Sequence, residues 1–163
     1  MDSADRNLLG FGSTDRVDKL EVNGSTVARK TFKDQVGYTH DSNILKELQR
    51  FTHKNIVQLL GFGSNYVDLE FVSSGTMWDW MHIQDRYTSF TGKDVHRMLI
   101  SCLEALEQFH LVIRRGHFEV KNTNILITEA KTPKLWDFSN SRNPECNHPA
   151  GHLRGHDGGA LTE

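Results

Sequence analysis

Near the N-terminus, apolar residues occur in short segments separated by polar, glycine-containing turns, a pattern that predicts β-strands. Residues 8–12, 16–22 and 26–32 form three short segments of this kind. Asn23-Gly24 separates the second segment from the third and is a strong hairpin signal, because both residues tolerate a positive φ angle. We therefore expect three consecutive antiparallel strands.

Farther along the chain the apolar residues follow both helical and extended spacings. Helical spacing covers residues 42–51 and 91–110, and Thr91 and Asp94 can form a capping box at the start of the second helix. Further strands are expected at 55–60, 66–72, 124–127 and 134–138, and a short helix at 77–82. The apolar stripe of residues 91–110 comprises Val95, Met98, Leu99, Cys102, Leu106 and Phe109, widened by Leu103. Five strands with one helix, then helices, then a small hairpin indicate an α+β fold.

Length and charge narrow the class of protein. A chain of 163 residues is expected to form one domain with tails. Its formal net charge of −2 leaves no electrostatic footprint for nucleic acid. No run approaches the roughly 18 apolar residues of a membrane span, and the polar N-terminus is not a signal peptide. Cys102 and Cys146 make no disulfide framework, so we expect a cytoplasmic protein. From the charge and the apolar runs we expect neither a membrane nor a nucleic acid as partner.

Residues 140–163 contain few apolar side chains and are expected to form a loop or a disordered tail. His148, His152 and His156 recur every four residues within it. Because neither a predicted helix nor a nearby thiol accompanies them, a polar tail is favoured over a metal site. Trp78 and Trp80 are similarly expected to pack rather than to form a ligand platform.

Two features near the N-terminus suggest phosphate chemistry. Gly10-Phe11-Gly12 lies between two strands, which fits a hairpin over phosphates and argues against a dinucleotide-binding turn that opens a helix. Lys30 on the third strand can reach phosphate oxygens, and Glu47 on the first helix can pair with it. Taken singly, these residues are better explained by an ordinary glycine turn and by solvated surface charges.

Two later segments resemble the catalytic motifs of protein kinases. Residues 116–126 (GHFEVKNTNIL) resemble the H-R-D-L-K-x-x-N-I-L catalytic loop, and residues 134–139 (KLWDFS) resemble the stretch around the D-F-G motif. Residues 53–57 and 68–77 are similar to the H-x-N-I-V stretch and to the hinge. The order matches across residues 9–139, which implies a kinase-like fold with a five-stranded antiparallel N-lobe plus one helix and a truncated, mainly helical C-lobe.

The resemblance also implies an organisation of the chain. We expect an N-terminal tail at 1–7, a kinase-like domain at 8–139 and an activation-segment remnant or disordered tail at 140–163. The N-lobe would span 8–72 and the partial C-lobe 73–139. No A-P-E motif follows, so we expect the helices that cover the lower-lobe helix of kinases to be missing, and a protein partner or self-association to cover its exposed face.

The resemblance implies a site for ATP and Mg²⁺. The expected ATP-binding residues are Gly10, Gly12, Val17, Ala28, Lys30, Glu47, Leu69, Glu70, Val72 and Leu126. Lys30, paired with Glu47, would hold the α- and β-phosphates. Asn124 and Asp137 match the Mg²⁺ ligands, and Glu119 and Lys121 match the catalytic base and the lysine that touches the γ-phosphate. His117 and Phe138 match two members of the internal hydrophobic spine.

Several residues depart from the kinase pattern. Glu119 stands where kinases have the catalytic Asp and reaches about one methylene farther; a misplacement of about 1 Å can cost roughly 100-fold in rate. Phe118 replaces the arginine that pairs with a phosphorylated activation loop. Asp15 replaces the third glycine and puts a carboxylate near the phosphates, and Ser139 replaces the glycine of D-F-G.

Three interpretations follow from the sequence. The first is an ATP-binding kinase-like domain with weak or absent phosphotransfer, a pseudokinase that acts as a regulator or decoy by binding a kinase or its partner. The second is an active minimal serine/threonine kinase that uses Glu119 as base. The third is a fragment without a stable fold. Whether the chain is an enzyme stays open among them.

Overall fold

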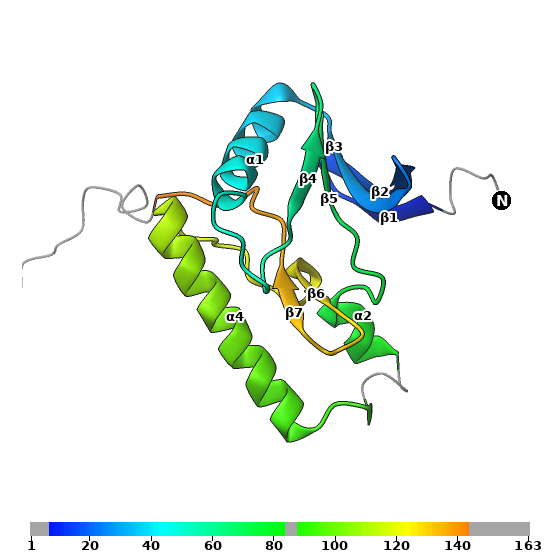
Figure 1. The fold of residues 1–163 in the computed structure, drawn as a ribbon, viewed down its shortest axis with the longest axis vertical. Helices are drawn as coiled ribbons and strands as arrows, with labels where there is room; N and C mark the ends of the chain where they lie inside the picture. Colours follow the sequence, from blue (N-terminus) through cyan, green and yellow to red (C-terminus); the bar gives the residue numbers. More distant parts are fainter. Residues whose placement is uncertain (1–6, 84–87, 144–163) are drawn as a thin grey trace, which may run out of the picture.

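A computed structural model describes residues 7–83 and 88–143, and in it an antiparallel sheet and helix α1 lie at one end, with helix α4 and a small hairpin at the other (Figure 1). The five strands are β1 (Leu8–Phe11), β2 (Asp15–Val22), β3 (Ser25–Phe32), β4 (Leu59–Phe62) and β5 (Tyr66–Glu70). They pair in the order β1-β2-β3-β5-β4. The α+β fold with a five-stranded sheet is thereby confirmed.

The two N-terminal hairpins form where the local turn signals predict them. Asn23 and Gly24 both have positive φ angles, 51° and 79°, and the register pairs Val22 with Ser25. In the turn between β1 and β2, the Gly12 N–H donates to the Asp15 carbonyl at 2.9 Å. The β1–β2 turn therefore places the glycine-rich segment beside the C-terminal end of β3.

Helix α1 (Gln35–Leu48) begins earlier and ends earlier than the expected 42–51. Its N-cap is Asp34, whose carboxylate accepts a hydrogen bond from the Gly37 N–H at 2.8 Å. The first turns are polar, so apolar periodicity gives no sign of them. The buried residues are Asp41, Ser42, Ile44, Leu45 and Leu48. Two polar side chains therefore belong to the inner face of this helix.

The expected strand at 55–60 is wrong in its first half, because β4 begins only at Leu59. Residues 55–57 instead lie against strand β7 (Pro133–Leu135). The Val57 N–H donates to the Leu135 carbonyl at 3.0 Å, and the Leu135 N–H donates to the Asn55 carbonyl at 2.8 Å. Strand β7 pairs with β6 (Ile125–Ile127), so this connection joins the sheet to the small hairpin.

The long helix α4 (Gly92–Ile113) exceeds the expected range by a few residues and ends at Arg114, whose φ is 54°. Its apolar residues form two faces rather than one stripe. The buried face comprises Met98, Cys102, Ala105, Phe109 and Ile113. The other face, with Val95, Leu99 and Leu103, is largely exposed.

The two tryptophans of the short helix α2 (Met77–His82), Trp78 and Trp80, differ in burial. Trp80 is buried, and its indole N–H donates to the Ser74 carbonyl at 2.8 Å, so the packing interpretation holds for it. Trp78 is exposed and stacks on His82. The C-terminal histidines lie outside the described residues. Within that described part, no helix is both long enough and apolar enough to cross a membrane.

The capping box of α4 makes a pH-dependent contribution to stability. The Asp94 carboxylate accepts hydrogen bonds from the Thr91 N–H and hydroxyl, at 2.9 and 2.8 Å, and these lower the pKa of Asp94 from 3.8 to about 2. A depressed folded-state pKa adds stability above the unfolded-state pKa that is lost as the pH falls. The difference in melting temperature between wild type and Asp94→Asn should therefore shrink on lowering the pH from about 5 to about 3. A constant difference across that range would refute this role.

Candidate functional site

An apolar cavity of about 190 Å³ lies between the five-stranded sheet and the β6–β7 hairpin. Its lining includes seven residues expected at an ATP site: Gly10, Val17, Ala28, Leu69, Glu70, Val72 and Leu126. It also includes seven that the sequence analysis did not assign: Leu9, Val57, Phe71, Gly75, Thr76, Asp79 and Trp136. Three of them, Leu9, Phe71 and Trp136, adjoin an expected site residue in sequence, so proximity along the chain was an available signal for these three only.

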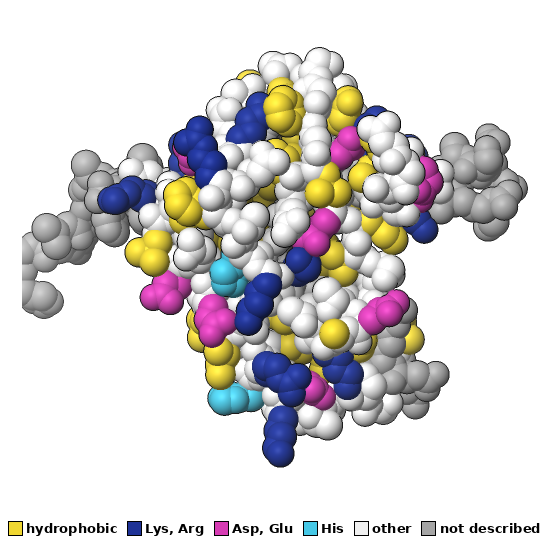
Figure 2. Space-filling model, in the orientation of Figure 1, with side chains coloured by type: hydrophobic (Ala, Val, Ile, Leu, Met, Phe, Trp, Pro, Cys, Tyr) yellow, Lys and Arg dark blue, Asp and Glu magenta, His cyan; other side chains and the backbone are white. Residues whose placement is uncertain are grey.

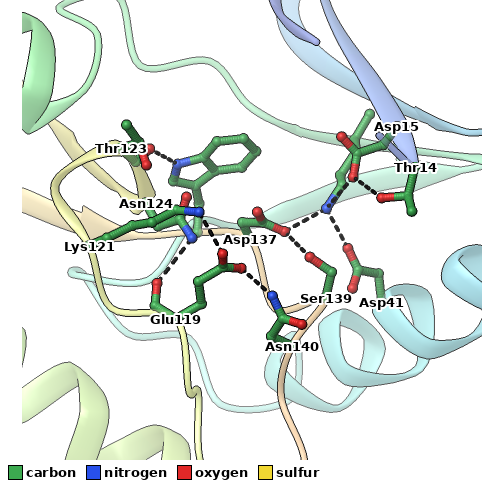
Figure 3. A network of polar contacts seen from close by, with 12 residues as sticks. Thr14, Asp15, Asp41, Glu119, Lys121, Thr123, Asn124, Asp137, Ser139 and Asn140 are labelled. Atoms are coloured by element: carbon green, nitrogen blue, oxygen red, sulfur yellow. Dashed lines mark hydrogen bonds and ion pairs between the residues drawn. The ribbon is translucent and has the colours of Figure 1, made fainter. Parts of the chain in front are cut away.

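Lys30 lies beyond this cavity with its ammonium group surrounded by carboxylates (Figure 3). Its Nζ is 2.7 Å from both Asp41 Oδ2 and Asp137 Oδ1 and 3.4 Å from Asp15 Oδ2. Burial alone lowers the pKa of Lys30, but the charges of Asp41, Asp137 and Asp15 outweigh it and raise that pKa above its ordinary value. Lys30 is therefore a buried, permanently charged ammonium at neutral pH.

The expected pair between Lys30 and Glu47 is wrong. Glu47 lies on the exposed side of α1, and Asp41 supplies the carboxylate instead. Glu47 follows Asp41 by six residues, and at about 100° per residue this puts the two side chains about 120° apart around the helix axis. Burial raises the pKa of Asp41 above its ordinary value despite the opposing effect of Lys30. The sequence held no sign of this partner, because Asp41 precedes the apolar part of the helix.

Asp137 belongs to the Lys30 group, and Figure 3 shows a second polar group, around Glu119, beside it. The φ angle of Asp137 is 61°, a left-handed conformation that is uncommon for a residue other than glycine. The Ser139 hydroxyl donates to Asp137 Oδ1 at 2.5 Å. Burial alone would raise the pKa of Asp137, but the opposing effects of Lys30 and Ser139 are larger. The pKa therefore lies below its ordinary value, and the carboxyl is ionised. Backbone strain of this kind concentrates at functional sites.

The Glu119 carboxylate is held by two side chains. Lys121 Nζ donates to Glu119 Oε1 at 2.5 Å, and the Asn140 amide donates to Oε2. These contacts, that of Lys121 first, lower the pKa of Glu119 below its ordinary value. Asn124 is buried, and its amide donates to the Glu119 carbonyl at 3.0 Å. The sequence analysis did not identify Asn140, which lies beyond the recognised motifs.

Behind these polar groups three rings pack together. Phe109 of α4 stacks on Phe138, with ring centroids 5.2 Å apart and an interplanar angle of 11°. His117 contacts both rings, at 5.9 and 5.3 Å between centroids. Burial lowers the pKa of His117, so this ring is neutral at physiological pH. Phe118 points outward with a φ of 58°.

The donor set suits Mg²⁺ only together with a phosphate ligand. Asn124 and Asp137 bring an amide and a carboxylate, the oxygen ligands that Mg²⁺ prefers, and Mg²⁺ commonly takes its remaining ligands from water and substrate phosphates. Among the residues that the structure describes, no group of three His, Cys, Asp or Glu side chains is arranged to hold a metal alone. The residues therefore fit Mg²⁺ that arrives with a nucleotide.

Comparison with known proteins agrees with this geometry. Residues 4–155 match the family model described as protein kinase domain. The chain is 26% identical over 148 residues to the LRR receptor-like serine/threonine-protein kinase GSO1 of Arabidopsis thaliana, covering 80% of this chain and 12% of that protein. It is 30% identical over 151 residues to the wall-associated receptor kinase-like 10 of the same plant, covering 86% and 20%. The chain thus spans about a fifth or less of the length of these relatives.

Proposed function

Because this chain belongs to the protein kinase family, we propose that residues 8–139 form a kinase-like domain that binds ATP but transfers phosphate weakly or not at all. In this proposal residues 8–72 are the N-lobe and 73–139 part of the C-lobe. The apolar cavity takes the adenine, and Lys30 faces the phosphates. The proposed setting is cytoplasmic, where ATP is available.

The observation that supports the proposal is that the two side chains needed for phosphotransfer, Glu119 and Lys121, are already bound to other side chains. Glu119 accepts from Lys121 and Asn140, and its pKa lies below the ordinary value. A general base works best when its pKa lies near the operating pH, so this carboxylate is a poor proton acceptor. Lys121, expected at the γ-phosphate, is committed to Glu119 as well. Both features weaken the transfer step without closing the adenine cavity.

Mg²⁺, when bound with ATP, would neutralise negative charge on the phosphates. Asp137 and Asn124 would hold it from the protein side. Asp137 is ionised and partly exposed, so its carboxylate can ligate a cation while still paired with Lys30. Asn124 is fixed by the hydrogen bond from its amide to the Glu119 backbone, which keeps the side chain from turning away.

A thermal-shift titration tests nucleotide binding. Addition of millimolar ATP with Mg²⁺ should raise the melting temperature, because a ligand that binds only the folded state stabilises it. Ala28→Phe would fill the cavity and should abolish the shift, whereas Val36→Phe, at an exposed position on α1, should leave it unchanged. Absence of any shift in the wild type would contradict ATP binding.

The second candidate is an active minimal serine/threonine kinase that uses Glu119 as base. The observation that favours it is that the residues of the catalytic motifs have ordered polar contacts. Asn124 and Asn140 both bind Glu119. Asp137 binds Lys30. Every residue type that the chemistry needs is therefore present in one region. The phosphotransfer measurement that closes the Discussion separates the two candidates.

We also propose that the domain acts by binding, as a regulator or decoy, through the exposed face of α4. Large apolar side chains are at least 44% exposed along this helix: Val95, Leu99, Ile100, Leu103 and Leu111. Figure 2 shows hydrophobic side chains at the surface along the side of the molecule where α4 runs. Extended apolar surface of this kind supports a protein partner or self-association.

Replacing two of these side chains should change the assembly state. We expect the purified wild type to associate with increasing concentration and the double variant Leu99→Lys, Leu103→Lys to stay monomeric, as measured by sedimentation velocity. The control, Glu104→Lys with Glu107→Lys, makes a larger charge change at exposed positions of the same helix and should still associate. A wild type that is monomeric at all concentrations would argue against self-association.

A further inference from the structure

The glycine-rich turn brings a carboxylate into the place that the proposed function gives to a phosphate. Asp15 begins β2, and its carboxylate Oδ2 lies 3.4 Å from Lys30 Nζ. Gly12 makes room for it: a Cβ at Gly12 would lie 2.9 Å from Asp15 Oδ1. The Asp15 side chain is only 16% exposed, so it is part of the packed site rather than a surface charge.

Other contacts hold the turn in this closed position. Lys33 Nζ donates to the carbonyls of Gly12 and Ser13, at 3.0 and 2.8 Å. The Lys33 N–H also donates to the Thr14 carbonyl at 2.9 Å. Since Lys33 directly follows β3, these bonds tie the turn to the strand that carries Lys30. The approach of Asp15 to Lys30 is therefore built into the hairpin.

Three carboxylates surround the Lys30 ammonium. Those of Asp41 and Asp137 accept hydrogen bonds from it at 2.7 Å, and that of Asp15 forms an ion pair with it at 3.4 Å. The formal charge of these four groups together is −2. A phosphate that approached Lys30 would displace Asp15 and would face two further carboxylates in a region shielded from water.

Two carboxylates line the adjoining cavity, and each has a partner: Asp79 accepts hydrogen bonds from Thr76, and Glu70 pairs with Lys134. The lining of the cavity near the sheet is apolar, with Val17, Ala28 and Leu69 from three strands, and Leu126 from β6 closes the other side. A flat heterocycle gains burial there without meeting the acidic group. Affinity for a base and affinity for its phosphates are thereby set by different residues.

We propose that this pocket selects an uncharged purine nucleoside over the corresponding nucleoside triphosphate, and that Asp15 determines the selection. The inference rests on the proposed function, because it assumes that the cavity takes the base and that Lys30 faces the phosphates. Asp15 then acts as an internal substitute for a phosphate group. Removing its charge takes one ion pair away from Lys30 and lowers the negative charge of the site.

Calorimetric titration with adenosine and with ATP, each in EDTA and in excess Mg²⁺, tests the proposal. The wild type should bind adenosine at least about tenfold more tightly than ATP under both conditions. Asp15→Asn, which keeps the shape, and Asp15→Gly, which removes the side chain, should each tighten ATP binding about tenfold or more and leave adenosine binding unchanged. Glu21→Gln is the control: it removes an exposed carboxylate of the same strand and should change neither ligand.

The outcomes separate this inference from the proposed function. If the wild type binds ATP as tightly as adenosine or more tightly, or if neither Asp15 variant changes the ratio, the selection by Asp15 is wrong while the nucleotide pocket stands. If neither ligand binds to the wild type or to either variant, with circular dichroism showing folded protein, then both the pocket and the selection are refuted.

Discussion

Lys30→Met should lower the free energy of unfolding by about 3–5 kcal/mol, as measured by urea denaturation at neutral pH. The reason is that Asp41, 2% exposed, would lose its ion pair while still buried. Asp137 and Asp15 would lose a partner in the same place, although both have some access to water. Removal of one member of a buried charge group costs far more than loss of a surface pair.

The loss of unfolding free energy in Lys30→Met should depend on pH and on the presence of the Asp41 carboxylate. Burial raises the pKa of Asp41, so acidification neutralises this carboxyl and the destabilisation of Lys30→Met should be smaller at acidic than at neutral pH. Adding Asp41→Asn should recover much of the lost stability. Lys54→Met, at an exposed loop position, is the matched control and should stay within about 0.5 kcal/mol of wild type. Equal effects at the two lysines would contradict the buried charge group.

Phe109→Ala should destabilise the domain by about 3–5 kcal/mol, because it removes a fully buried ring and leaves a cavity. The ring stacks on Phe138, which directly follows Asp137, and contacts His117, which lies two residues before Glu119. The same change should therefore loosen both polar segments of the site. Urea denaturation gives the stability, and protection of the backbone amides near Asp137 from hydrogen exchange gives the local effect.

Leu111→Ala is the control on the same helix, two residues farther along. Leu111 is 67% exposed, so its removal should change the free energy of unfolding by no more than about 0.5 kcal/mol. A loss below about 1 kcal/mol for Phe109→Ala would mean that the ring stack contributes little to the fold.

Local signals account for the elements that the sequence predicts well. The β2–β3 hairpin depends on Asn23-Gly24, and the start of α4 depends on the capping box of Thr91 and Asp94. Each works over a few residues, so it can be read directly from the chain. The expectations were wrong where the determining contact is distant: residues 55–57 lie against β7 because of hydrogen bonds to Leu135, far along the sequence.

Within the candidate site, too, some residues could be predicted from local motifs and others could not. The apolar residues that line the cavity follow from motifs on single strands. The partners of the charged residues do not: whether Asp41 or Glu47 meets Lys30 depends on where α1 begins, and that is set by the Asp34 cap rather than by apolar spacing. Asn140 reaches Glu119 because the backbones of Gly116 and Arg142 pair and bring the two loops together. Such pairings arise only from the folded chain.

In the proposed function the site holds nucleotide but is arranged against phosphate transfer, since the carboxylate expected as base and the lysine expected at the γ-phosphate bind each other. The most direct measurement is incorporation of labelled phosphate from ATP with Mg²⁺, into the domain itself and into generic protein substrates. Wild type and Asp137→Ala are compared at equal concentration. Both proteins should show the same low incorporation. Incorporation by the wild type that clearly exceeds that of Asp137→Ala would contradict it and establish an active kinase.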